Sequence, residues 1–165
     1  MNLKVFLNRF FIVNIIFLIL ISCGKSKTTL SEIDIVYEDN QMLFKKKSKR
    51  FTGVVFEYYN NGKTKAEINV INGLKNGVLR QYYGNGKLQV ESKFKKGELI
   101  GKFTTFYENG NEQIIAFYKM NLRMGSFEEF FDNKKLKLCG NYFNGIKIGQ
   151  FEEYFKSGGK AVYNY

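Results

Sequence analysis

The chain has 165 residues, a formal charge of +11 at pH 7, 17 Phe, 11 Tyr, two Cys, and neither His nor Pro. Without His there is no imidazole base or metal ligand, and two Cys are too few for a disulfide framework or a Cys-rich zinc site. A charged fraction of 25% excludes a polytopic membrane protein. We therefore expect one domain that is not an enzyme and holds no metal and no cofactor.

The N-terminus has the pattern of an export signal. Lys4 and Arg9 precede an apolar run, Phe10 to Ile21, that is shorter than the roughly 20 residues of a spanning helix. Leu20-Ile21-Ser22-Cys23 resembles the bacterial lipobox, which implies cleavage after Ser22 and lipid attachment to Cys23. The sequence therefore predicts a signal peptide over 1–22 and a lipoprotein of the cell envelope. In a bacterium with two membranes we expect it in the outer membrane, because Gly24 follows the Cys, as in outer-membrane lipoproteins. A signal peptide with a chance Cys, or a signal anchor, is the alternative.

Residues 23–50 are predicted to be a lipidated tether and entry segment. Gly24 to Thr29 has the composition of a tether, and Met42 to Phe44 is a candidate entry strand. A basic cluster follows, formed by Lys45, Lys46, Lys47, Lys49 and Arg50. It is a candidate contact with anionic lipid or lipopolysaccharide phosphate. The alternative is a solvated loop that protects the edge of the first repeat strand.

Five copies of one unit fill residues 51–165. The repeat glycines, which are Gly53, Gly77, Gly101, Gly125 and Gly149, recur every 24 residues. An aromatic pair follows each glycine after five and six residues, and turn residues such as Asn61-Gly62 and Asn72-Gly73 follow it twice. The predicted repeats are 53–76, 77–100, 101–124, 125–148 and 149–165.

This unit resembles the variant MORN repeat, and proteins with such repeats often have the label of YwqK-type antitoxins. Two repeats depart from the pattern, with Asn111 in place of Lys and Asn133-Lys134-Lys135 in place of Asn-Gly-Lys. The resemblance implies a repeat β-sheet and makes a toxin one candidate partner.

The residues themselves predict the same fold. Asn-Gly between two apolar runs favours a two-residue type I′ hairpin. The expected fold is therefore all-β, an elongated single-layer antiparallel β-meander of about ten strands made from repeated 24-residue hairpins. A Gly inside each strand indicates either an aromatic ring packed over it or a β-bulge.

Two-residue turns would give the sheet two different faces. The first face is apolar and includes the columns that begin at Val55, Tyr59, Ala66 and Val70, the last copy of the Ala66 column being Val162. The second is mixed, with charges such as Lys65, Arg80, Glu91 and Lys137, and one row of rings that we call the aromatic track: Tyr58, Tyr82, Phe106, Phe130 and Tyr154. The track is either a recognition surface or a shield for the sheet backbone.

No catalytic group of residues is evident. Glu128-Glu129 and Glu152-Glu153 are neighbours in sequence, but adjacent strand residues point to opposite faces. Cys139 is predicted to be a passive small residue. Nucleic acid is not an expected partner of an exported protein.

The sequence thus favours a membrane-anchored lipoprotein whose sheet is a non-catalytic protein-interaction module. Its predicted partners are the bilayer, through acylated Cys23, and an unidentified protein. An antitoxin or immunity protein is the first alternative, and a module that binds glycan or phospholipid is the second. The oligomeric state stays open.

Overall fold

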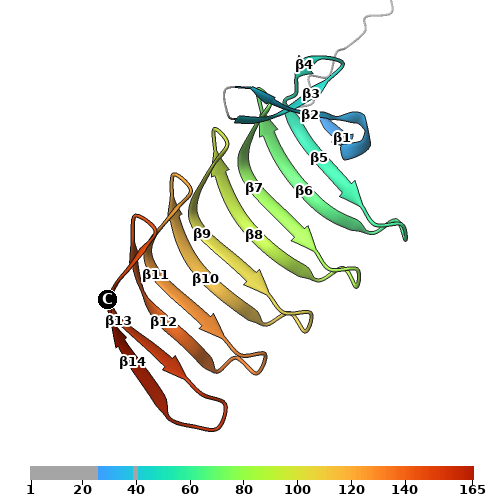
Figure 1. Ribbon diagram of the computed structural model, residues 1–165. Helices are drawn as coiled ribbons and strands as arrows, with labels where there is room; N and C mark the ends of the chain where they lie inside the picture. The colour runs from blue at the N-terminus through green and yellow to red at the C-terminus, as the bar shows by residue number, and fades with distance from the viewer. Residues whose placement is uncertain (1–25, 39–40) are drawn as a thin grey trace, which may run out of the picture.

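The computed structural model describes residues 26–38 and 41–165, and the predicted signal peptide and Cys23 lie outside these ranges. Apart from the short 3-10 helix η1 (Leu30–Glu32), the described elements are strands (Figure 1). Their bounds are β1 Lys27–Thr29, β2 Asp34–Glu38, β3 Gln41–Lys46, β4 Lys49–Arg50, β5 Gly53–Tyr58, β6 Thr64–Ile71, β7 Leu74–Tyr82, β8 Leu88–Lys95, β9 Glu98–Phe106, β10 Glu112–Lys119, β11 Leu122–Phe130, β12 Leu136–Phe143, β13 Ile146–Tyr154 and β14 Lys160–Asn164.

The repeat region is one long sheet. Strands β5 to β14 pair in chain order, each antiparallel to the next, and β1 pairs in parallel with the outer edge of β5. Figure 1 shows a single twisted layer in which the hairpins follow one another along the sheet. The all-β meander of 24-residue hairpins is therefore confirmed.

The second turn of each repeat is the predicted two-residue type. Asn72 and Gly73 have φ of 50° and 79°, and both central residues of the later second turns are also at positive φ. This is the type I′ geometry, which matches the twist of the flanking strands.

The first turn of each repeat is different from the prediction. Gly62 N–H donates to the Tyr59 carbonyl and Tyr59 N–H donates to the Lys63 carbonyl, so the loop has three residues, and only Gly62 is at positive φ. Such a loop is a type I turn followed by a left-handed glycine. Lys65 is an extra residue between the pairs Tyr58–Thr64 and Glu57–Ala66. This bulge compensates for the longer loop, so the predicted register is correct in the body of the hairpin.

Four of the repeat glycines lie in β-bulges, namely Gly77, Gly101, Gly125 and Gly149, whereas Gly53 pairs regularly with Val70. Three residues around Gly125 stand opposite one residue of β10, between the pairs Ala116–Phe127 and Tyr118–Arg123. Gly125 has φ of 93°, and a Cβ built on it, or on Gly101 or Gly149, would have no atom within 4 Å. Tyr118 and Tyr142 lie close to repeat glycines as predicted, opposite Gly101 and Gly125, but no ring occupies the place of a side chain there, so positive φ is the reason for glycine.

The first face forms the core by pairing large residues with small ones. Ser92 lies opposite Leu79, Ala116 lies opposite Phe127, and a Cβ on Gly140 would be 2.5 Å from Cγ of the Phe151 ring. Phe151 is completely buried although the sheet has a single layer. The amino group of Lys147 lies 4.8 Å from its ring centroid, and the Tyr142 and Tyr165 rings meet it edge to face.

Phenol hydroxyls tie consecutive repeats together. Tyr59, Tyr83 and Tyr107 donate to the carbonyls of Tyr82, Phe106 and Phe130 at 2.6, 2.6 and 2.8 Å. Each bond joins the second aromatic of one repeat to the backbone of the next repeat, and Phe131 occupies the corresponding position in the fourth repeat.

Strand β14 is shifted by one residue from the predicted register. The fifth first turn has the three-residue loop but no compensating bulge, so Phe151 pairs with Tyr163 and Glu152 pairs with Val162. A one-residue shift exchanges the two faces of a strand. Val162 therefore lies with Glu152 on the second face, not on the first as predicted, and Tyr163 reaches Glu153 on the first face with a 3.0 Å hydrogen bond.

The N-terminal segment caps the first repeat. Val54 N–H donates to the Ser26 carbonyl, and β1 continues this pairing along β5, so residues 26–29 belong to the sheet and the tether prediction is wrong for them. Met42 to Phe44 lie in a strand as predicted, but in a separate sheet of β2, β3 and β4. Phe44 N–H donates to the Gly73 carbonyl. The Phe44 side chain packs with Val55 and Val70 in one core cluster.

Candidate functional site

The aromatic track lies along one edge region of the sheet. Its five members are the last residues of β5, β7, β9, β11 and β13, which all run in the same direction (Figure 1). Because two strand spacings separate successive members, the rings repeat about every 9.6 Å. Tyr58 is 47% exposed and the other four are half-buried, so each ring presents part of its surface to solvent.

Recesses accompany the track at repeat intervals. One lies between the first turn of repeat one, at Gly62 to Thr64, and Tyr82. The corresponding recesses two and three repeats later contain Phe130 and Tyr154, and the one at Tyr154 has a volume of about 640 Å³. Tyr58 lines a further recess against η1. Four of the five track residues therefore border a hollow in the surface, which a residue that only shields the backbone does not require.

Lysines that sequence reasoning did not single out line the same recesses. Lys63 lies beside Tyr82, Lys134 beside Phe130, and Lys135 and Lys156 beside Tyr154. All four are exposed. The sequence does offer a sign of them, because Lys63 and Lys135 follow directly on the first-turn residues.

Hydrogen bonds fix the last ring of the track. The Tyr154 hydroxyl donates to Glu152, which also accepts from Lys160 at 2.9 Å. These two donors hold the pKa of Glu152 below its ordinary value, and the carboxylate raises the pKa of Tyr154. Burial, followed by the charge of Glu67, raises the pKa of Tyr82. Both phenols are therefore neutral hydrogen-bonding groups near pH 7.

The predicted charges of the second face are only partly correct. Arg80 and Glu91 share the second face as predicted, and they form an ion pair across β7 and β8 at 2.7 Å. Lys65 and Lys137 instead bond to Glu57 and Glu129, which lie on the first face. The bulge after each first turn is the physical reason, since it rotates the extra residue to the other side of the strand.

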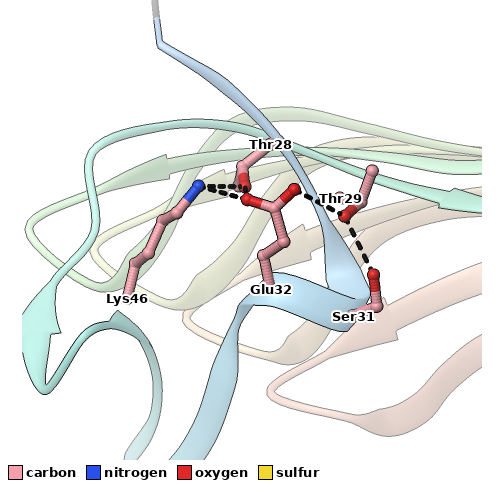
Figure 2. A network of polar contacts seen from close by, with 5 residues as sticks. All are labelled: Thr28, Thr29, Ser31, Glu32 and Lys46. Atoms are coloured by element: carbon pink, nitrogen blue, oxygen red, sulfur yellow. Dashed lines mark hydrogen bonds and ion pairs between the residues drawn. The ribbon is translucent and has the colours of Figure 1, made fainter.

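The basic cluster lies on the hairpin of β3 and β4 and forms ion pairs with glutamates of β2 and η1. Lys45 and Arg50 bond to Glu38, and Figure 2 shows Lys46 reaching the Glu32 carboxylate and the Thr28 hydroxyl. These lysines hold the pKa values of Glu32 and Glu38 below the ordinary range. The cluster is not a loop along the edge of β5, because β1 occupies that edge. Lys47 and Lys49 lie at the exposed hairpin turn.

The carboxylate pairs and the cysteine form no reactive group. Glu128 and Glu152 both pair with Cys139, whereas Glu129 and Glu153 point to the other face. Burial, followed by the charge of Glu152, raises the pKa of the Cys139 thiol, which disfavours the reactive thiolate. Within residues 26–38 and 41–165, no three potential metal ligands gather. A helix able to span a bilayer does not occur in those ranges either.

Comparisons with known proteins agree with the repeat architecture. The family model described as MORN repeat variant matches three consecutive segments, residues 51–72, 75–96 and 99–120. No curated protein matches the chain. A solved structure with some likeness is titled "Crystal structure of GtfA/B complex bound to UDP and GlcNAc", with 8% identity and a TM-score of 0.27. The matched region comprises 80% of this chain and 24% of the chain in that structure. At a TM-score of 0.27 the likeness supports no argument. Three consecutive segments of the chain are thus similar to the variant MORN repeat, a repeat that suggests a binding module.

Proposed function

We propose that the protein is a lipid-anchored component of the cell envelope whose repeat sheet binds another protein along the aromatic track. The observation that supports this best is the set of recesses beside the track. The first face buries Val55 and Phe151 completely, while the track leaves rings partly exposed beside hollows. A surface that repeats in this way suits an extended partner and offers no enclosed pocket for a small substrate.

Photocrosslinking in whole cells tests the binding surface. A photoreactive phenylalanine analogue at Tyr82 should give a discrete crosslinked product. Replacing Tyr58, Phe130 and Tyr154 with Ser should remove that product while circular dichroism stays unchanged. Tyr37, which is 75% exposed in the small sheet, is the matched position. The same product from Tyr37, or a product that survives the three replacements, would contradict the proposed surface. A toxin as the captured partner would select the antitoxin alternative.

The lipid anchor is tested separately. The proposal rests on the lipobox-like residues before Cys23, which lie outside the described residues. Metabolic labelling with palmitate should mark the protein, and Cys23→Ala should abolish the label. Cys139→Ala is the control, because that thiol lies within β12 and should not affect acylation. Label that persists in Cys23→Ala would disprove the anchor.

A further inference from the structure

We infer that the aromatic track binds an acidic polypeptide segment in the polyproline II conformation, an inference that deepens the proposed protein-binding function and rests on it. The first step is the spacing of the track. Its rings lie two strands apart, which is about 9.6 Å. A polyproline II helix has three residues per turn and a rise of about 3.1 Å, so it presents a side chain in the same direction about every 9.3 Å. An extended β-strand alternates its side chains and cannot place every third residue on the same side.

The second step is the chemistry of each recess. A track ring and at least one exposed lysine line each of the recesses at Tyr82, Phe130 and Tyr154. Glu67 also lines the first of these recesses, and Glu112, which is paired with Lys102 at 3.5 Å, lines the second. The ring offers an apolar surface for a proline, and the lysine offers a positive charge. A segment with a proline facing the rings and a carboxylate facing the first turns, both repeated every three residues, would satisfy both groups in every recess. Proline-rich segments are known to dock on aromatic-lined surfaces because their conformation is already ordered.

The third step concerns hydrogen bonds at the recess beside Tyr154. Its lining includes the amino groups of Lys135 and Lys156 and the Ser157 hydroxyl as donors, and none of its residues is Asp or Glu. Asn133 Oδ1 already accepts from Lys135 N–H, which leaves the side-chain NH₂ as a donor. A proline-rich backbone has many carbonyl acceptors and few N–H donors. A sugar polymer brings hydroxyls that donate as well as accept, and this lining has no carboxylate to accept from them.

The charge of the first-turn edge agrees with an acidic ligand. Lys134 and Lys135 make no ion pair within the described part of the chain, and Lys156 has only a 3.9 Å pair with the exposed Asp132. Lys63 and Lys87 extend the positive edge toward the first repeat, where they bond to backbone carbonyls of the next turn. A ligand carboxylate can therefore approach these lysines without displacing a buried pair.

Fluorescence anisotropy with synthetic peptides tests the inference on the full chain in a neutral detergent. The probe is a labelled (Pro-Glu-Pro)₅ peptide. Replacing Tyr82, Phe130 and Tyr154 with Ser should weaken binding at least tenfold, and replacing Lys134, Lys135 and Lys156 with Ser should weaken it several-fold and reduce its salt dependence. Tyr37→Ser and Lys47→Ser, which change exposed residues outside the track, should leave affinity within a factor of two.

Three control probes decide the ligand class. A peptide of alternating Pro and Glu has the same residues at the wrong spacing, (Pro-Lys-Pro)₅ reverses the charge, and polygalacturonate presents carboxylates on a sugar polymer. Each should bind at least tenfold more weakly than (Pro-Glu-Pro)₅. Equal binding of any of them, or no binding of (Pro-Glu-Pro)₅, would overturn the inference. If crosslinking at Tyr82 still succeeds in cells, only the ligand class is wrong and the protein-binding surface stands.

Discussion

Replacing Gly140 with Ala should destabilise the protein, although alanine is intrinsically the better strand residue. Gly140 has no positive φ, so no backbone strain opposes the change, and intrinsic preference alone predicts a gain of roughly 0.5–1 kcal/mol. The new Cβ would, however, lie 2.5 to 2.6 Å from three atoms of the Phe151 ring. That ring is fully buried and is held by Tyr142, Tyr165 and Lys147. Because the ring has little room to move, overpacking should cost about 1–3 kcal/mol.

A double-mutant cycle measured by urea unfolding isolates this contact. Phe151→Leu alone should cost about 1–2 kcal/mol, since it removes buried volume. In Gly140→Ala/Phe151→Leu the smaller side chain leaves space for the methyl group, so the double variant should be at least about 1 kcal/mol more stable than the sum of the single changes predicts. Ile68 and Leu79, which lie opposite each other in the first two repeats, show that a leucine at this position accommodates a side chain opposite it.

The sign of the single change decides the outcome. A stability gain in Gly140→Ala would show that intrinsic preference outweighs the ring contact, and strict additivity in the cycle would show that the two residues do not touch. Gly84→Ala is the control, because a Cβ there has nothing within 4 Å and φ is not positive. It should change the free energy of unfolding by less than about 0.5 kcal/mol.

Three further predictions concern the phenol hydrogen bonds between repeats, the β-bulges and the N-terminal segment that caps the first repeat. Tyr83→Phe removes the 2.6 Å hydrogen bond to the Phe106 carbonyl and should lower the free energy of unfolding in urea by about 1 kcal/mol. Phe131→Tyr should raise it by a similar amount. No change in either variant would mean that the phenol hydrogen bonds do not stabilise the fold. Gly101→Ala, at φ of 68°, should cost about 1–2 kcal/mol through backbone strain alone, and a neutral result would contradict the bulge. Because the pKa of Glu38 is lowered in the folded state, its ionised carboxylate stabilises the fold above the ordinary pKa of Glu, and this stabilisation is lost on acidification. Glu38→Gln should therefore reduce the fall of the thermal midpoint between about pH 5 and pH 3. An unchanged pH profile of the thermal midpoint would refute this prediction.

The repeat period and the second turns were predictable from sequence because local chemistry determines them. A two-residue turn with both φ values positive needs residues such as Asn72 and Gly73, and this requirement recurs every 24 residues. The first turn was not predictable from the same dipeptide. Asn61-Gly62 fits a two-residue loop, but it fits equally well the last two positions of a three-residue loop, where only the glycine is at positive φ. The Asn61 side chain favours the longer loop by accepting from Lys63 N–H at 3.0 Å.

The faces of the strands depend on whether a bulge follows that longer loop, and local sequence does not show this. In repeat one the bulge at Lys65 restores the register, so Ala66 and Val70 return to the core. In repeat five there is no bulge, and β14 turns Tyr163 toward Glu153 instead. Tyr165 then packs on Phe151 at 5.3 Å between ring centroids, an edge-to-face contact that buries the last large ring of the core.

The same longer loops explain the recesses of the candidate site. A three-residue loop extends the first-turn edge beyond the end of the paired strands, so Lys63 and Gly62 form one wall of a hollow whose other side is Tyr82 in the next repeat. A two-residue type I′ turn at this position would end closer to the last strand pair and leave less depth beside the ring. Shortening the loop by deleting Asn60 should therefore make the recess at Tyr82 shallower and weaken binding of (Pro-Glu-Pro)₅. Unchanged binding after this deletion would mean that the depth of the recess does not contribute to peptide binding.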